Sequence, residues 1–326
     1  MSNGIRLIFG AGGIGEGKIS HSWTTPSEVN ELLPELSALG LTQLDSAASY
    51  PPGAKWVAET LLGQSKAVGK GFTIDTKILV TGDNGAGHLT EENIAASVKK
   101  SLELLGTNEV NILYSHGPDP ITPAEETARA YDKHYRAGKC AAIGLCNYSR
   151  AQMEEFLTIC EEKGYKKPSV YQAEYNLLNR HVEQMFPLLR EHGIVFYAFG
   201  PLAGGFLTGK VSILDPKVDL SRGRWGEGNF PLYPKTFDKP AIHAAMRAFY
   251  EISQDHGITS TEASLRWLIH HSALKEPDTL ILGATKVNQL KGNVEMCKLG
   301  PLPEVIVKAA EDMWQTVKEE LPAPVF

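Results

Sequence analysis

Four side chains that could together move a proton follow three separate apolar runs. The stretch LDSAASY places Asp45 at the end of one run and Tyr50 on the loop beyond it. FTIDTK ends in Lys77, and VNILYSH ends in His116. Each alone has a structural explanation, as a turn former, a rim contact, a surface charge or a core histidine. Because α/β folds place their sites at the carboxyl ends of strands, all four in order indicate one shared site.

Composition and charge exclude several classes of function. The chain has 326 residues, 42% of them hydrophobic and 21% charged, which is typical of a globular enzyme. A net charge of −6 argues against a nucleic-acid surface. No apolar run approaches the roughly 20 residues of a membrane span. The four cysteines, Cys140, Cys146, Cys160 and Cys297, lack metal-ligand spacing and are expected as reduced thiols, so we expect a soluble cytoplasmic protein with no metal.

The run GAGGIG formally matches a dinucleotide-binding fingerprint at Gly10, Gly12 and Gly15. Such a fingerprint needs its third glycine to open a helix, with an acid at the end of the next strand. Here the next helix begins later, at the capping box of Thr25 and Glu28. A Rossmann fold is therefore disfavoured.

Strands and helices alternate along the chain without a linker between them. Eight strands are expected, and all but the first follow a helical segment: Ile5–Phe9, a strand ending at Asp45, Phe72–Lys77, Val110–Ser115, Ala141–Leu145, Ser169–Gln172, Ile194–Phe199 and Thr279–Leu282. This pattern predicts one domain over residues 1–326, a closed (β/α)8 TIM barrel of the α/β class with C-terminal helices.

Other segments carry more local expectations. A helix around Lys55–Leu62 should end at Gly63, and another should span Val182–His192. The segment 208–240, after the seventh strand, is rich in Gly, Pro and charge and is expected to be a long clasp loop. Its positive groups, Lys210, Arg222 and Arg224, could meet an anionic ligand.

Several motifs in order give the chain a resemblance to a known family. They are LDSAASY, the TK that ends in Lys77, YSHGPD, IGLCNYS, YQAEYN, FGPLAGGFLTGK, RGRWGEGN, SLRWLIHHS and ILGATKVNQLKGN. Over nearly its whole length the chain resembles the aldo-keto reductases, most closely the branch of aflatoxin-aldehyde and succinic-semialdehyde reductases. The resemblance implies an eight-stranded barrel that binds NADP(H) in extended form and reduces aldehydes, with ketones as a further class.

The resemblance makes Tyr50 the general acid. A phenol with a pKa near 10 holds its proton firmly, so it needs a neighbour that stabilises phenolate. Lys77 would be that neighbour, and Asp45 would keep it charged through an ion pair. His116 would hydrogen-bond and orient the carbonyl oxygen. The four side chains are expected within hydrogen-bonding reach of one another.

The resemblance also supplies a cofactor-binding set. Asp45, Cys146, Asn147 and Gln172 would surround the nicotinamide and Phe199 would stack on it. Gly200, Pro201, Leu202, Gly204, Gly205 and Lys210 would wrap the pyrophosphate. Ala284, Thr285, Lys286, Gln289 and Asn293 would hold the adenosine end, with Lys286 and Arg222 or Arg224 favouring a 2′-phosphate and hence NADP over NAD.

For the substrate, the expected contacts are His116, Trp23, Arg224, Trp225 and Tyr233. The family commonly has serine at Cys146 and tyrosine at Phe199, and the tail PAPVF lacks arginine. A preference for acidic aldehydes is therefore in doubt. Trp23, Pro51 and Trp225 suggest an apolar mouth to the pocket, so aromatic or bulky aldehydes are expected instead.

Besides an active reductase, two other functions and one oligomeric state are to be considered. A cofactor-binding regulatory subunit of the same fold, with little turnover, is the runner-up. A metal-dependent hydrolase is disfavoured because no clustered ligands stand at strand ends. A homodimer is open, because dimers occur in the resembled family.

Overall fold

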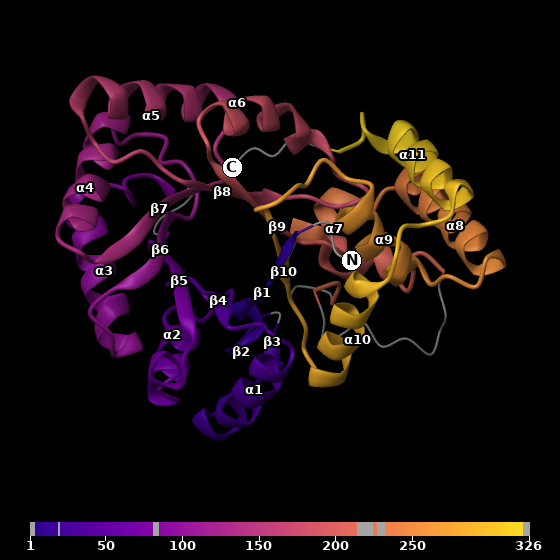
Figure 1. Cartoon of the computed structure of the whole chain (residues 1–326), viewed down its shortest axis with the longest axis horizontal. Coiled ribbons are helices and arrows are strands. Elements are labelled where there is room, and N and C mark those ends of the chain that lie inside the picture. Colours follow the sequence, from indigo (N-terminus) through magenta and orange to yellow (C-terminus); the bar gives the residue numbers. More distant parts are fainter. Residues whose placement is uncertain (1–3, 19, 81–84, 214–223, 227–231, 322–326) are drawn as a thin grey trace.

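Eight parallel strands form a closed barrel in the computed structural model, which describes residues 4–18, 20–80, 85–213, 224–226 and 232–321 (Figure 1). The strands lie in the order β1-β10-β9-β8-β7-β6-β5-β4, and β4 pairs with β1 to close the ring. Their bounds are β1 (Arg6–Gly10), β4 (Gln43–Asp45), β5 (Thr73–Lys77), β6 (Val110–Ser115), β7 (Cys140–Cys146), β8 (Val170–Glu174), β9 (Val195–Phe199) and β10 (Thr279–Leu282). The predicted TIM barrel is confirmed.

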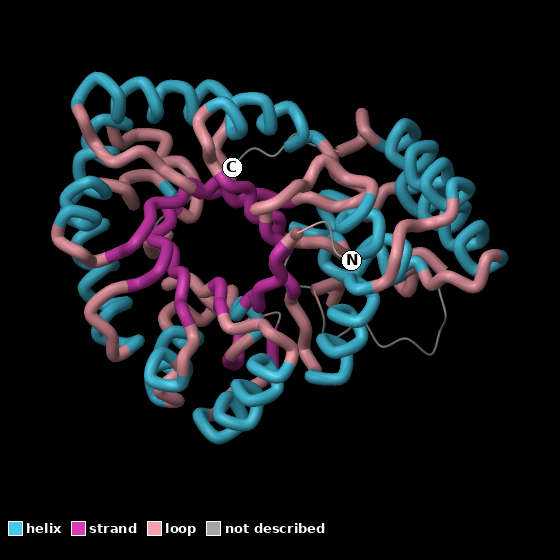
Figure 2. Tube along the Cα trace, viewed as in Figure 1, coloured by secondary structure: helices cyan, strands magenta, loops and turns pink. Residues whose placement is uncertain are grey.

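Helices surround the ring of strands (Figure 2). They are α1 (Pro26–Ala38), α2 (Val57–Gln64), α3 (Glu91–Leu105), α4 (Ala124–Arg136), α5 (Arg150–Lys163), α6 (Phe186–Glu191), α7 (Leu232–Phe237), α8 (Pro240–Asp255), α9 (Ser260–His270), α10 (Val287–Lys298) and α11 (Glu304–Val317). Their apolar faces and the outer faces of the strands form the main core.

Local sequence explains where several helices begin and end. In α1 the Thr25 side chain accepts from Glu28 N at 3.3 Å and Glu28 Oε2 accepts from Thr25 N at 3.1 Å, as the predicted capping box requires. Ser149 and Gln152 form the same box at α5. These caps fix the loops between strand ends and helices, which are the loops that carry the site.

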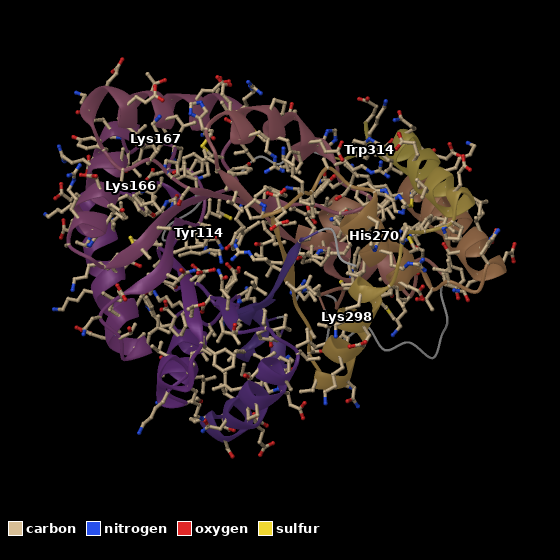
Figure 3. All side chains as sticks on the ribbon, in the orientation of Figure 1. Tyr114, Lys166, Lys167, His270, Lys298 and Trp314 are labelled. Atoms are coloured by element: carbon tan, nitrogen blue, oxygen red, sulfur yellow. The ribbon has the colours of Figure 1, made fainter. Side chains whose placement is uncertain are left out.

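A second, smaller apolar cluster fills the barrel itself: Ile8, Ile112, Tyr114, Val170, Tyr197 and Ile281. Tyr114, labelled in Figure 3, is fully buried and lies opposite Gly144 in the β6–β7 register. A Cβ on Gly144 would lie 2.2 Å from Tyr114 Cδ1, so only glycine leaves room for this ring.

Two expected helix boundaries are wrong. Helix α2 continues through Gly63 to Gln64, because this glycine provides close packing instead of a helix end: a Cβ there would lie 1.8 Å from Leu104 O. The helix expected over Val182–His192 begins as a 3-10 helix, η4 (His181–Met185), and only α6 is α-helical. Pro187 stands in the first turn of α6, where a missing N–H is tolerated.

The GAGGIG run after β1 forms short regular elements. A 3-10 helix, η1 (Ala11–Gly13), leads into an antiparallel hairpin of β2 (Gly15–Gly17) and β3 (Ser20–Ser22). Gly15 therefore begins a strand, which agrees with the rejection of the dinucleotide fingerprint. Lys18 N donates to Pro52 O at 2.9 Å, so the hairpin supports the loop that carries Tyr50.

Candidate active site

A buried ion pair joins the ends of β4 and β5. Lys77 is 0% exposed, and its Nζ donates to Asp45 Oδ1 at 2.7 Å, Asp45 Oδ2 at 2.8 Å and Ser46 O at 2.9 Å. All three of its N–H groups are thus used. Burial alone would lower the pKa of Lys77, but the charges of Asp45 and Tyr50 hold that pKa above its ordinary value. Lys77 is an ammonium at any working pH.

Tyr50 presents the face of its ring to this ammonium. Lys77 Nζ lies 5.1 Å from the ring centroid, and no hydrogen bond joins the two side chains. This differs from the expected hydrogen-bonding reach, because Asp45 and Ser46 take the N–H groups of Lys77. Burial raises the pKa of Tyr50 to about 12, and the charge of Lys77 opposes the rise. The phenol therefore keeps its proton at neutral pH.

His116, directly after β6, packs edge-on against Tyr50. The ring centroids lie 5.5 Å apart at an interplanar angle of 80°. Burial, together with the charges of Lys77 and His88, lowers the pKa of His116 to about 3. Its Nδ1 is buried and has no hydrogen-bond partner among the described residues. His116 is therefore a neutral imidazole whose buried Nδ1 is unpaired within the described part of the chain.

Polar side chains at the next strand ends are linked to the ion pair. Gln172 Nε2 donates to Asp45 Oδ1 at 2.8 Å, and Asn147 Nδ2 donates to His116 O at 3.3 Å. Between them, Cys146 Sγ lies 3.0 Å from Asn147 Nδ2 and 3.8 Å from Gln172 Oε1. Burial raises the pKa of Cys146 to about 12, so it stays a neutral thiol. The ends of β4 to β8 thus share one polar network.

The loop after β9 is shaped by glycines. Gly200, Gly204 and Gly205 have φ angles of 67°, 65° and 98°, which favour glycine. Phe199 ends the strand, and Leu202 O accepts from Gly205 N at 2.8 Å after Pro201. A Cβ on Gly205 would meet nothing within 4 Å, so this backbone borders open space. Lys210, just beyond η5 (Ala203–Thr208), is exposed.

The expected adenosine-binding residues lie on the loop after β10 and on α10. Lys286 is the N-cap of α10, its side chain makes no capping bond, and it is exposed. Gln289 Oε1 accepts from Thr285 N at 3.2 Å, and Ala284 and Asn293 are buried. The N–H groups of this helix end are thus available to an anion beside a cationic side chain.

The expected substrate contacts are only partly brought together. Arg224 Nη1 donates to Tyr233 Oη at 3.3 Å, and Tyr233 is one of the groups that raise the pKa of Tyr50. Trp225 Nε1 donates to Gly204 O at 3.1 Å, and Trp23 packs edge-on against Phe9 at 5.8 Å. Arg222 lies outside the described residues.

Two acids near the site were not predicted: Asp75, which is fully buried, and Glu174, which is partly exposed. Asp75 lies two residues before Lys77, and Glu174 lies two residues after Gln172. Burial raises the pKa of each to about 7. The period of two along a strand could have revealed both, since residues i and i+2 share a face.

The described residues contain no group of three or more His, Cys, Asp or Glu side chains that could hold a metal ion. None of their helices is long and apolar enough to cross a membrane.

Comparison with known proteins gives the family. A model of the Aldo/keto reductase family matches residues 6–315. An aldo-keto reductase of Pseudocercospora fijiensis is 35% identical over 301 residues, 90% of this chain and 100% of the relative. Human aldo-keto reductase family 7 member A3 is 35% identical over 300 residues, 87% of each chain.

Human aflatoxin B1 aldehyde reductase member 2 is 34% identical over 292 residues, 87% of this chain and 80% of the relative. These relatives confirm the family and the branch that the motifs predicted. Because the family model spans nearly the whole sequence and the relatives align over most of their own lengths, the chain belongs to the aldo/keto reductase family and is an oxidoreductase.

Proposed function

We propose that this protein uses NADPH to reduce aldehydes, with ketones as a further class, to alcohols, and that Tyr50 is the general acid. The observation that carries the proposal is the buried Lys77–Asp45 pair against the face of the Tyr50 ring. Reducing a carbonyl needs a proton at oxygen, and a positioned phenol beside a fixed ammonium can supply it.

The proposed roles follow from the charge states. Tyr50 gives its proton to the carbonyl oxygen, and Lys77 stabilises the resulting phenolate across the ring face. Asp45 holds the ammonium in place by accepting hydrogen bonds from two of its N–H groups. His116 is neutral, so it can donate a hydrogen bond to the same oxygen without adding a charge, and this fixes the carbonyl for attack.

The residues fit a dinucleotide laid along the carboxyl end of the barrel. When bound, NADPH supplies the hydride. Asn147, Gln172 and Cys146 offer amide and thiol groups to a carboxamide, and Phe199 offers a ring face. The open backbone at Gly205 suits a pyrophosphate. The N-terminus of α10 with Lys286 suits the 2′-phosphate, which supports NADP over NAD.

For the substrate, we propose a preference for aromatic or bulky aldehydes over acidic ones. Arg224 is already bonded to Tyr233 and lies with its guanidinium 5.3 Å from that ring. The guanidinium of Arg224 therefore already contacts Tyr233 and is less available to a substrate carboxylate. The names of the relatives, which include an aflatoxin B1 aldehyde reductase, agree with a bulky substrate.

The test follows NADPH consumption with a panel that includes 4-nitrobenzaldehyde and succinic semialdehyde. Wild type should turn over both and favour the aromatic one in kcat/KM. Tyr50→Phe should lose about 10²- to 10⁴-fold in kcat, since it removes the general acid.

Tyr135→Phe is the matched control, because Lys166 Nζ lies 4.8 Å from the Tyr135 ring, far from the strand ends that carry the site. It should leave the rate unchanged. Tight NADPH binding with no turnover of any aldehyde or ketone would instead favour the regulatory subunit.

A further inference from the structure

A second carboxyl shares the buried surroundings of Lys77 and Asp45. Asp75 stands two residues before Lys77 on β5, so both side chains point to the same side of the strand. In the β4–β5 register Asp75 is the direct partner of Asp45. The exposed fractions of Asp75, Lys77 and Asp45 are 0%, 0% and 3%. One ammonium thus faces two carboxyl groups away from water.

Neutral amides alone hold Asp75. Its Oδ2 accepts from Gln43 Nε2 at 2.7 Å and its Oδ1 from Asn111 Nδ2 at 2.6 Å. No cation of the described residues forms an ion pair with it, because Lys77 directs its three N–H groups to Asp45 and Ser46. Like charges side by side on a sheet repel each other, so Asp75 and Asp45 resist being ionised together.

The groups around Asp75 allow its charge to change. The titratable and charged side chains on the elements packed against it are Asp45 on β4, Lys77 on β5, Tyr114 on β6, Tyr197 on β9, Arg6 on β1 and, behind the strand, Glu59 on α2. Tyr114 Oη is buried with no partner among the described residues, and Arg6 reaches only Tyr197, at 2.9 Å. Burial and Asp45 raise the pKa of Asp75 to about 7, against the opposing effects of Gln43, Asn111 and Lys77.

We propose that Asp75 is a positioning residue that acts through Lys77, and that its charge sets how strongly Lys77 stabilises the phenolate formed when Tyr50 gives up its proton. The inference rests on the proposed function, in which Tyr50 is the acid. Only a proton exchange with water is involved: Asp75 gains or loses one proton, and no other bond changes.

The direction follows from the charges. When Asp75 is protonated, Lys77 has one counter-charge, Asp45, and its field favours the Tyr50 phenolate. When Asp75 ionises, a second negative charge weakens that field, so proton donation slows. Aldehyde reduction should therefore fall by about fivefold as pH rises through the ionisation of Asp75 near neutrality.

The test is the pH profile of the rate of aldehyde reduction in wild type and Asp75→Asn, between pH 5.5 and 8.5. The rates are taken from single turnovers of the NADPH-loaded protein, and a slower rate with deuterated NADPH is expected, since hydride transfer is then the step observed. Asp75→Asn should lose the neutral step and stay at the fast level, with an unchanged dissociation constant for NADPH. The same step in both proteins would overturn the proposal.

Two further variants separate charge from packing. Asp75→Asn/Asn111→Asp returns a carboxyl to the same hydrogen-bonded pair and should restore a step in the profile. Gln43→Leu removes a donor that lowers the pKa of Asp75, so it should move the step to higher pH. A step that stays in place in Gln43→Leu also overturns the proposal, even if Asp75→Asn does not fold.

Failure of the proposed function gives a different result. In that case wild type reduces no aldehyde with NADPH, or Tyr50→Phe remains fully active. If wild type is active, Tyr50→Phe is inactive and the change in rate near neutral pH is the same with and without the Asp75 carboxyl, the inference about Asp75 is rejected. The proposed function would then still stand.

Discussion

At the scale of single residues, the Lys77–Asp45 pair is expected to serve catalysis more than stability. A buried ion pair is often no more stable than well-packed apolar residues, but removing one partner leaves an unpaired buried charge. The effect of the pair is therefore to hold one ammonium beside the Tyr50 phenol.

This distinction gives a prediction for three variants. Asp45→Asn and Lys77→Met should each lower the free energy of unfolding by about 3–5 kcal/mol. The double variant should be less destabilised than the sum of the two, because it leaves no unpaired charge. All three should lose aldehyde reduction. Urea unfolding and steady-state kinetics measure the two effects, and strictly additive losses of stability would count against a direct pair.

His116 predicts a pH dependence of stability. Its pKa is lowered from 6.5 to about 3 in the fold, so the unfolded chain binds a proton that the folded protein does not. Its contribution to stability is present above pH 6.5 and is lost as pH falls toward 3, by about 1.4 kcal/mol per pH unit. His116→Gln should reduce the slope of the unfolding free energy against pH in that window by the equivalent of about one proton. An unchanged slope would show that His116 titrates normally.

The residue types of the site could be predicted from the sequence, but their contacts could not. Asp45, Tyr50, Lys77 and His116 stand at strand exits in the order that the motifs indicated. The use of all three Lys77 N–H groups by Asp45 and Ser46 depends on side-chain geometry that no motif contains. Asp75 was missed because an acid in the middle of a strand resembles a surface residue until the barrel closes around it.

At the scale of elements, the strands were easier to predict than the helices between them. Apolar runs marked all eight barrel strands, and the expected bounds agree with the observed ones to within about two residues; for β4 only the end at Asp45 was expected. Helices α7 and α8 were missed because α7 lies within the Gly- and Pro-rich segment 208–240, which was expected to be a loop, and α8 begins at its end. The β2–β3 hairpin was missed because each strand has only three residues. Such short elements are fixed by tertiary contacts.

Gly63 gives a prediction for the packing of α2 on α3. Gly63→Ala should destabilise the protein by at least about 2 kcal/mol, because its Cβ would lie 1.8 Å from Leu104 O. Gly69→Ala is the matched control, since a Cβ there meets nothing within 4 Å, and should stay within about 0.5 kcal/mol of wild type. Equal unfolding free energies for the two variants would contradict this packing.

The N-terminus of α10 gives a prediction for cofactor choice. Lys286→Met should raise the dissociation constant for NADPH by about tenfold or more and leave that for NADH nearly unchanged, since only NADPH has the 2′-phosphate. Lys298→Met is the control, because Lys298, labelled in Figure 3, lies at the other end of the same helix and pairs with Glu295. Fluorescence titration measures both constants. If the dissociation constants for NADPH and NADH rise equally, Lys286 does not bind the 2′-phosphate.

At the scale of the whole molecule, closure of the barrel brings the site together. Asp45 on β4 and Gln172 on β8 are 127 residues apart in sequence, yet their side chains share a hydrogen bond. Alternation of strands and helices predicted this closure, because parallel strands joined by helices place all their carboxyl ends on one face. The mouth could not be predicted equally well, because its residues come from long loops whose path the pattern does not set.

Single-turnover reduction of 4-nitrobenzaldehyde by the NADPH-loaded protein tests the central claim most directly. Rapid mixing follows the loss of NADPH fluorescence in wild type and Tyr50→Phe at equal cofactor occupancy. If Tyr50 is the proton donor, the Phe variant binds NADPH as wild type does and transfers hydride about 10²- to 10⁴-fold more slowly. Equal single-turnover rates would contradict the account, because proton donation would then not depend on Tyr50.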